Sequence, residues 1–142
     1  MFVLHERLAA DTVLLGDLSL SRVLLMYDSQ YPWCILVPRQ PEIKESYQLS
    51  EADQHQLCLE SALLGKMLMD VFAGHKLNVA ALGNMVPQLH IHHIVRYPDD
   101  IAWPKPVWGL FPAVPYSEQA LIQQKSKILD ALGRAKIFFQ PD

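Results

Sequence analysis

Three short apolar runs near the start of this chain constrain its fold more than any other feature. The runs are residues 12–16, 23–27 and 33–37. Gly16-Asp17 ends the first run, residues 28–32 contain the break after the second, and Pro38 stops the third. Short runs rich in Val, Leu and Ile and bounded by such residues are typical of β-strands. Because the joints between them are tight, the three runs predict an antiparallel meander.

Helices and further strands are predicted after the meander. The expected elements are a helix from Ser50 to about Phe72, strands at 77–82 and 88–96, and a helix at 118–133, with a short helix at 3–10 before the meander. Ser50 with Asp53 three residues later resembles a capping box, and Ser117 is placed to cap the last helix. This order predicts an α+β fold with a five-stranded, mostly antiparallel sheet and two main helices. The central strands do not alternate in polarity, so we expect both faces of the sheet to be covered.

Length, charge and cysteine content restrict the class of protein. A chain of 142 residues with 51% hydrophobic residues predicts one domain with one core. A net charge of −3 provides no basic surface for binding nucleic acid. Cys34 and Cys58 lack the CxxC spacing of a zinc site, and they fit a reducing, cytoplasmic setting. No apolar run is long enough to span a membrane, so no membrane partner is expected.

The stretch 88–96 carries the side chains best suited to chemistry. Side chains of a strand alternate between its faces, so Gln88, His90 and His92 are predicted to form a polar row on one face, with neighbours about 7 Å apart. His93 points to the other face and is predicted to be structural. Imidazole is the side chain best suited to nucleophilic and acid–base chemistry near neutral pH, so this row predicts a functional site.

A histidine in this row can attack phosphorus. One ring nitrogen attacks while the other donates its proton to a fixed oxygen, and the backbone carbonyls around Gln88 are candidates for that oxygen. The attack yields a phosphoramidate that water can hydrolyse, which divides one difficult displacement into two easier ones. The phosphoryl oxygens need hydrogen-bond donors, and His92 and Asn84 are close enough in sequence to supply them.

Two other interpretations of the same residues stay open. Histidines are more often surface or core residues that take no part in chemistry. A His-x-His pair on a strand also occurs in metal sites, where His90 and His92 would need a third ligand, and Asp99 and Asp100 are the nearest carboxylates. No HExxH or other metal motif is present. We therefore expect neither a metal nor another cofactor.

The segment 84–94 resembles the signature of the histidine triad family. That signature is His-φ-His-φ-His-φ-φ, in which φ is apolar, usually preceded by Gln-x-Val-x. Here Asn84 stands at the place of the preceding Gln, and Gln88 stands at the place of the first histidine. His90 and His92 match the second and third histidines. His93 stands at an apolar place, so two departures, Gln88 and His93, lie inside the signature.

Other blocks of the chain are also similar to this family. Residues 27–38 resemble its strand–turn–strand unit, and Trp103-Pro104 is similar to the tail of some of its branches. Asp28 matches a position that commonly contacts the ribose, and Asn78 matches an asparagine that often precedes the signature. The resemblance extends over about residues 10–108.

The resemblance implies a fold and an assembly. It implies one histidine-triad-like domain over 1–142, with its core at about 10–108 and a C-terminal tail and helix at 109–142. Members of the family have a five-stranded antiparallel sheet. Two subunits usually join their sheets, so a homodimer with a continuous ten-stranded sheet is expected.

The resemblance also implies an activity. His90 would attack the α-phosphate of a dinucleoside polyphosphate or a nucleoside phosphoramidate, and His92 would help to hold the phosphate. The products would arise by hydrolysis or by nucleotidyl transfer through a nucleotidyl-histidine. Substrate contacts are expected at Asp28, Asn78, Asn84 and Gln88. The alternatives are a nucleotide-binding module with little turnover and a metal-dependent hydrolase that uses His90 and His92.

Overall fold

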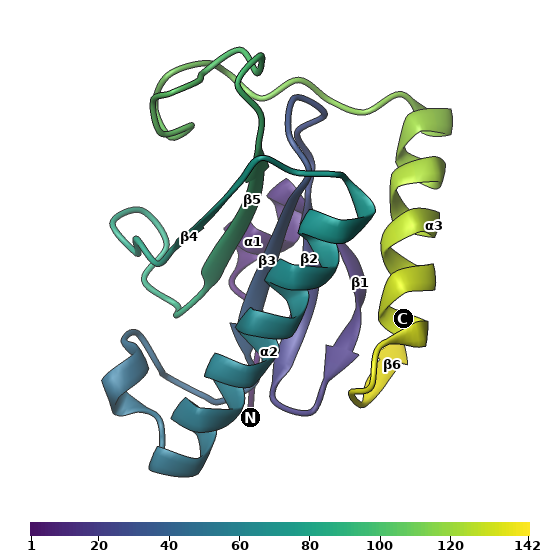
Figure 1. Ribbon diagram of the computed structural model, residues 1–142. Coiled ribbons are helices and arrows are strands. Elements are labelled where there is room, and N and C mark those ends of the chain that lie inside the picture. Colours follow the sequence, from purple (N-terminus) through teal and green to yellow (C-terminus); the bar gives the residue numbers. More distant parts are fainter.

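The computed structural model describes residues 1–142, and its sheet contains six strands (Figure 1). The strands are β1 (Thr12–Leu18), β2 (Ser21–Met26), β3 (Trp33–Pro38), β4 (Lys76–Ala80), β5 (Ile91–Arg96) and β6 (Phe139–Pro141). They lie in the order β4-β5-β3-β2-β1-β6, and every neighbouring pair is antiparallel. The predicted meander is confirmed, because β1, β2 and β3 are neighbours in chain order.

Two long helices and two short ones accompany the sheet. They are α1 (Glu6–Asp11), the 3₁₀ helix η1 (Ser46–Gln48), α2 (Glu51–Val71) and α3 (Glu118–Arg134). Both predicted caps are present. The Ser50 hydroxyl accepts a hydrogen bond from the Asp53 backbone N–H at 3.1 Å, and the Ser117 hydroxyl accepts one from Ala120 at 3.2 Å. Each bond satisfies a backbone donor that the first turn of a helix leaves unpaired. The α+β class is confirmed.

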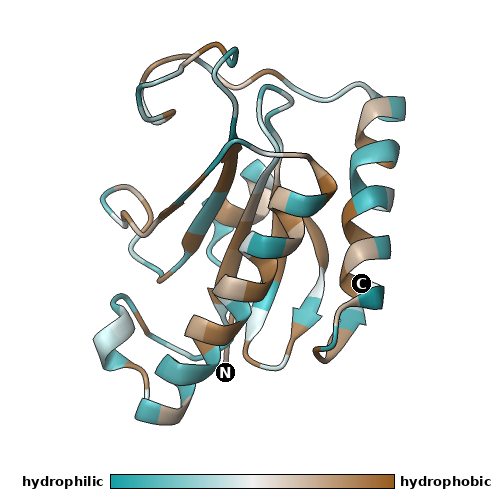
Figure 2. Ribbon diagram, viewed as in Figure 1, coloured by the Kyte–Doolittle hydropathy of each residue, from teal (hydrophilic) through white to brown (hydrophobic).

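The two long helices cover one face of the sheet. Leu64 and Leu68 of α2 and Ile128 and Leu132 of α3 belong to one buried cluster with apolar side chains of β1, β2, β3 and β5. Teal and brown residues alternate along α3 in Figure 2, as expected for a helix that buries one side. The apolar strand residues on this face therefore have the helices as their partners.

The opposite face is covered by α1 and by irregular segments that precede and follow β5. Leu8 of α1, Val86, Ala102 and Val107 share a second buried cluster with side chains of β2, β3 and β5. The expectation that both faces of the sheet are covered is confirmed. Because both faces are buried, the central strands need no alternation of polar and apolar residues.

The predicted end of the first strand at Gly16-Asp17 is wrong, because β1 continues to Leu18. The register between β1 and β2 shifts just before Gly16, as in a β-bulge. Gly16 pairs with β6, and a Cβ at this position would collide with the Gln140 carbonyl oxygen and the Phe139 ring. Glycine thus permits the close approach of a sixth strand, and the prediction of five strands is wrong by this one.

The predicted strand at 88–96 begins only at Ile91. Residues 81–90 form an irregular segment between β4 and β5, so strict alternation does not extend back to Gln88. Within β5 the alternation holds: His92 lies opposite Ile35, whereas His93 lies opposite Cys34, which faces the helices. None of the helices combines the length and apolarity needed to span a membrane.

Candidate functional site

His90 and His92 lie together at a cavity of about 360 Å³. The cavity is lined by Met26, Leu82, Gly83, Asn84, Met85, Val86, His90, His92, Trp108 and Gly109. The two imidazole rings are 4.9 Å apart between centroids and are inclined at 75°. Both residues are buried, with 6% of His90 and 5% of His92 exposed. The end of the irregular segment and the start of β5 therefore place two imidazoles in one small space.

The ring of His90 is oriented by the backbone. Its Nδ1 lies 2.6 Å from the Gln88 carbonyl oxygen. A carbonyl oxygen can only accept a hydrogen bond, so Nδ1 carries the proton and donates it. In the neutral ring, Nε2 then holds the free electron pair and can act as a nucleophile. The expectation that a backbone carbonyl near Gln88 holds a ring nitrogen of this histidine is confirmed.

The ring of His92 is oriented the opposite way. The Trp33 indole Nε1–H donates to Nδ1 of His92 over 3.0 Å. Because Nδ1 accepts, the neutral ring carries its proton on Nε2, which makes Nε2 a donor. The pKa of His92 is lowered to about 3. Burial is the main cause, and the neighbouring imidazoles of His90 and His93 contribute the rest. His92 is therefore neutral at physiological pH.

The two rings supply complementary groups at one cavity. His90 offers an electron pair on Nε2, and His92 offers an N–H on Nε2. A nucleophile next to a hydrogen-bond donor is the arrangement needed to attack an electrophile while its developing negative charge is stabilised. The different chemistry of the two residues comes from their Nδ1 partners, a carbonyl for His90 and an indole for His92.

Gln88 does not form a row with the histidines. Its side-chain oxygen accepts from the His5 backbone N–H and its amide nitrogen donates to the Val3 carbonyl, both over 2.8 Å. The amide group thus ties the N-terminal segment to the residue whose own carbonyl holds His90. The predicted polar row is wrong for Gln88, because the regular strand starts three residues later.

The other predicted substrate residues are distributed over three places. Asn84 lines the cavity beside the histidines. Asp28 is buried in the turn after β2, where its Oδ1 accepts from the backbone N–H groups of Gln30 and Val114. Asn78 lies on β4, where its Oδ1 accepts from the Arg96 guanidinium over 2.9 Å. Neither Asp28 nor Asn78 lines the cavity.

Two tryptophans at this site were not predicted as functional residues. Trp33 stands in β3 opposite Ile94, so its ring lies diagonally across from His92 on the same face of the sheet. Trp108 lies in the irregular segment after β5, with its ring 5.2 Å from His92 and 6.1 Å from Trp33 between centroids. The sequence did carry one signal for Trp33. A tryptophan in a strand that is buried on both faces usually donates its indole N–H to a hydrogen-bond acceptor nearby.

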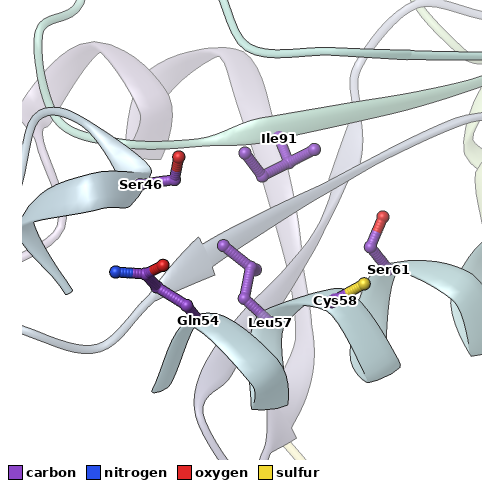
Figure 3. Close-up of a pocket in the computed structure, with 6 residues that line it drawn as sticks. All are labelled: Ser46, Gln54, Leu57, Cys58, Ser61 and Ile91. Atoms are coloured by element: carbon purple, nitrogen blue, oxygen red, sulfur yellow. The ribbon is translucent and has the colours of Figure 1, made fainter. Parts of the chain in front are cut away.

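His93 serves the opposite face of β5. Its Nδ1 donates to the Ile91 carbonyl over 3.1 Å, so its Nε2 accepts from the Ser61 hydroxyl of α2 over 2.7 Å. Burial lowers the pKa of His93 to about 4. Ser61 also lines a cavity of about 320 Å³ between α2, η1 and β5, with Ser46, Gln54, Leu57, Cys58 and Ile91 (Figure 3). The geometry of His93 agrees with the predicted structural role.

The carboxylate of Asp100, one of the two nearest in sequence to a possible His90–His92 metal site, is already engaged. Both Asp100 carboxylate oxygens accept from the Arg96 guanidinium, over 2.8 and 3.0 Å, in a buried ion pair. No group of three His, Cys, Asp or Glu side chains is placed to share a metal ion. His90 and His92 thus have no third ligand, and their Nδ1 atoms are already bonded within the protein.

The fold and the histidine pair place this chain in a known class of α+β proteins. The model of the HIT domain family matches residues 7–99, and the chain belongs to this family. Proteins of the family generally have nucleotide hydrolase or transferase activity. The recognition of a histidine triad protein from the sequence is confirmed at the level of the family.

Three solved structures are similar to this chain over nearly its whole length. A histidine triad protein from Marinobacter aquaeolei VT8 is 55% identical, with a TM-score of 0.92, and the match covers 94% of this chain and 98% of that one. Histidine triad proteins from Bradyrhizobium japonicum and Sinorhizobium meliloti are 42% and 40% identical. Both have a TM-score of 0.90, and both matches cover 92% of this chain and 97% of theirs. No curated protein matches the chain.

Proposed function

We propose that this protein hydrolyses or transfers a nucleotidyl group by attack of His90 Nε2 on the α-phosphate of a nucleotide. The N–P bond forms while the bond from phosphorus to the leaving group breaks, and the leaving group takes the electron pair. Water or another acceptor then attacks the nucleotidyl-histidine, and Nε2 recovers its electron pair. The two steps together release a nucleoside monophosphate or a transferred nucleotide.

One observation carries this proposal: the 2.6 Å hydrogen bond from His90 Nδ1 to the Gln88 carbonyl. It leaves Nε2 unprotonated, which a nucleophile requires. It also persists after attack, when the ring becomes positively charged, so the carbonyl then stabilises the intermediate. His92 Nε2–H is the donor that supports the phosphoryl oxygens.

The lining of the cavity suits a nucleotide. Met26, Leu82, Met85, Val86 and Trp108 provide apolar surface for a base, and Asn84 provides a polar group near the histidines. In this proposal Asn84 contacts the substrate. Asp28 orders the turn and the tail, and Asn78 orders Arg96, because their hydrogen bonds are already made there.

In this proposal Gln88 replaces the first histidine of the triad as a supporting residue. Its backbone carbonyl orients His90, and its amide fastens the N-terminal segment. The location is proposed to be cytoplasmic. A free buried Cys34 and a free exposed Cys58 support a reducing environment.

The test is intact-protein mass spectrometry and steady-state kinetics with diadenosine polyphosphates and adenosine phosphoramidates. We expect a transient nucleotidyl adduct on the parent protein and none on His90→Ala, with turnover reduced by about 10⁴-fold or more. His75→Ala, which changes a histidine outside the cavity, is the matched control and should retain the adduct. Nucleotide binding without adduct or turnover in the parent would overturn the proposal in favour of a nucleotide-binding module.

A further inference from the structure

The hydrogen bond between Trp33 and His92 restricts what His92 can do in a reaction. Trp33 is buried, with 5% exposed, and its indole has one polar group, an N–H that can donate but never accept. This N–H occupies the electron pair of His92 Nδ1 at 3.0 Å. To take up a second proton at Nδ1, His92 would have to break this bond and leave two N–H groups facing each other. The surroundings therefore oppose an imidazolium at this position.

A neutral His92 donates a hydrogen bond but is not a source of protons. Loss of its Nε2 proton would leave an imidazolate anion, which a buried site without a cation does not support. The polar and charged groups around His92 are the imidazoles of His90 and His93 and the indoles of Trp33 and Trp108. None of them is a fixed anion that would favour a protonated His92. Its low pKa, about 3, agrees with this geometry.

No other residue of the cavity supplies a proton to a leaving group. Among its ten lining residues only His90 and His92 titrate, and His90 is the nucleophile. Lys44 and Glu45 line a separate small hollow beside His90, and both side chains are exposed to solvent. The site therefore contains a nucleophile and a fixed donor but no general acid.

Leaving groups differ in their need for such an acid. A phosphate or pyrophosphate departs as a stable anion, which needs hydrogen bonds rather than a full proton. An amine that leaves phosphorus must take a proton as the P–N bond breaks, because an amide anion is far too basic to depart. General acid catalysis contributes about 10²–10⁴-fold when it is needed, so a site without it discriminates against amines by a comparable factor.

We propose that Trp33 is a positioning residue that holds His92 as a permanent neutral hydrogen-bond donor. The site therefore takes nucleotides with a phosphate leaving group and discriminates against phosphoramidates. This inference rests on the function proposed above. In the first step the His90 N–P bond forms and the P–O bond to the leaving phosphate breaks. The phosphate oxygen takes the electron pair. In the second step water attacks phosphorus, the electron pair of the N–P bond returns to His90, and the proton of water passes to solvent.

The first test compares kcat/KM for diadenosine triphosphate with that for adenosine 5′-phosphoramidate of a primary amine. We expect the parent protein to prefer the triphosphate by about 100-fold or more. Trp33→Phe keeps an aromatic ring but frees His92 Nδ1 to accept a proton, so the preference should narrow by about tenfold and become dependent on pH. Equal or better use of the phosphoramidate by the parent would overturn the proposal.

Trp108→Phe is the matched control for the loss of an indole next to His92. The Trp108 Nε1 is buried without a hydrogen-bond partner, so this change removes an indole N–H but leaves the Trp33–His92 bond intact. We expect Trp108→Phe to leave the ratio of the two kcat/KM values unchanged, whatever it does to each value. A ratio altered equally by both variants would overturn the role given to Trp33.

A second readout does not depend on turnover. Nitrogen-15 NMR of the imidazoles should show the parent His92 protonated on Nε2 only, from neutral pH to below pH 5, and titrating at higher pH in Trp33→Phe. A His92 protonated on Nδ1 in the parent would overturn the proposal even if no variant folds. The His90 adduct separates the two proposals, since an adduct with a preference for phosphoramidate refutes this inference alone. The absence of adduct and turnover refutes the proposed function, and the leaving-group preference falls with it.

Discussion

At the scale of single residues, His92 and His93 are adjacent in sequence but lie on opposite faces of β5, and both are held neutral by burial. Each accepts one hydrogen bond on a ring nitrogen, from Trp33 and from Ser61. Protonation would break the bond from Trp33, would reverse the bond with Ser61, whose hydroxyl can also accept, and would place a charge in buried surroundings. The folded protein therefore binds protons less readily than the unfolded chain does, and this makes its stability depend on pH.

We expect the free energy of unfolding to decrease as the pH falls from about 6.5 toward 4. In the unfolded chain both histidines have pKa values near 6.5, whereas in the folded protein the values are about 3 and about 4. Below pH 6.5 the unfolded state thus takes up protons that the folded state does not, and stability is lost. At pH 5 the loss is on the order of 4 kcal/mol, about 2 kcal/mol from each histidine, which urea unfolding at pH 5 and pH 7.5 can measure.

A pair of variants separates this effect from other titrations. His93→Gln keeps a polar side chain for Ser61 but cannot titrate, so the dependence on pH should become less steep. His55→Gln removes an exposed histidine of α2, the helix that carries Ser61, and should leave the dependence of stability on pH as in the parent. The explanation fails if parent and His93→Gln lose stability equally over this range.

At the scale of elements, one buried carboxylate joins α2 to the turn between β1 and β2. Glu60 is fully buried, and its two oxygens accept from the backbone N–H groups of Leu20 and Ser21 over 2.7 and 3.1 Å. Gln56 also donates to one of these oxygens over 3.1 Å. A turn whose N–H groups point into the protein needs such an acceptor, because unpaired buried donors are costly.

We expect Glu60→Ala to reduce the free energy of unfolding by about 2–4 kcal/mol, since it leaves two buried backbone donors without an acceptor. Asp70→Ala removes an exposed carboxylate of the same helix, which pairs with Lys66 at the surface. It should change stability by less than about 1 kcal/mol. Urea unfolding of both variants at pH 7.5 is the measurement. Equal effects of the two substitutions would contradict the role assigned to Glu60.

At the scale of the whole molecule, β4 presents an open edge. It pairs with β5 on one side only, and it is longer than β6 at the other edge of the sheet. Val79 of β4 and Leu82 just after it are exposed apolar side chains. An unpaired edge beside exposed apolar residues is suited to pairing with a second copy. We propose a homodimer joined through β4, whose continuous sheet would then have twelve strands rather than the expected ten.

The dimer has a direct test in sedimentation velocity at micromolar concentration. We expect the parent to sediment as a dimer and Val79→Asp, on β4 itself, to shift it toward the monomer, because a charge would be buried at the contact. Ile122→Asp places the same charge at an exposed apolar position of α3, away from this edge, and should remain dimeric. A parent that sediments as a monomer would contradict the proposal.

Much of the fold followed from local patterns in the sequence. Serine caps located the starts of α2 and α3, and apolar runs located β2, β3 and the main part of β5. The failures came from contacts between distant residues. In the sequence, Gly16 indicates the end of a strand, but in the structure it permits β6 to approach β1. The three residues of β6 are too few to show a pattern that predicts this pairing.

The sequence alone determined the order of the two long helices and of β1 to β5, and the presence of His90 and His92 two residues apart, because capping and strand patterns are properties of neighbouring residues. It also indicated that a carbonyl near Gln88 would orient the nucleophile. Only the tertiary structure decided what each imidazole can do. The Nδ1 partner of His90 lies two residues away, whereas that of His92 is Trp33, 59 positions away in the chain and brought near by the pairing of β3 with β5. Hydrogen-bond partners select the tautomer of a histidine, and partners this distant in sequence are set by the fold.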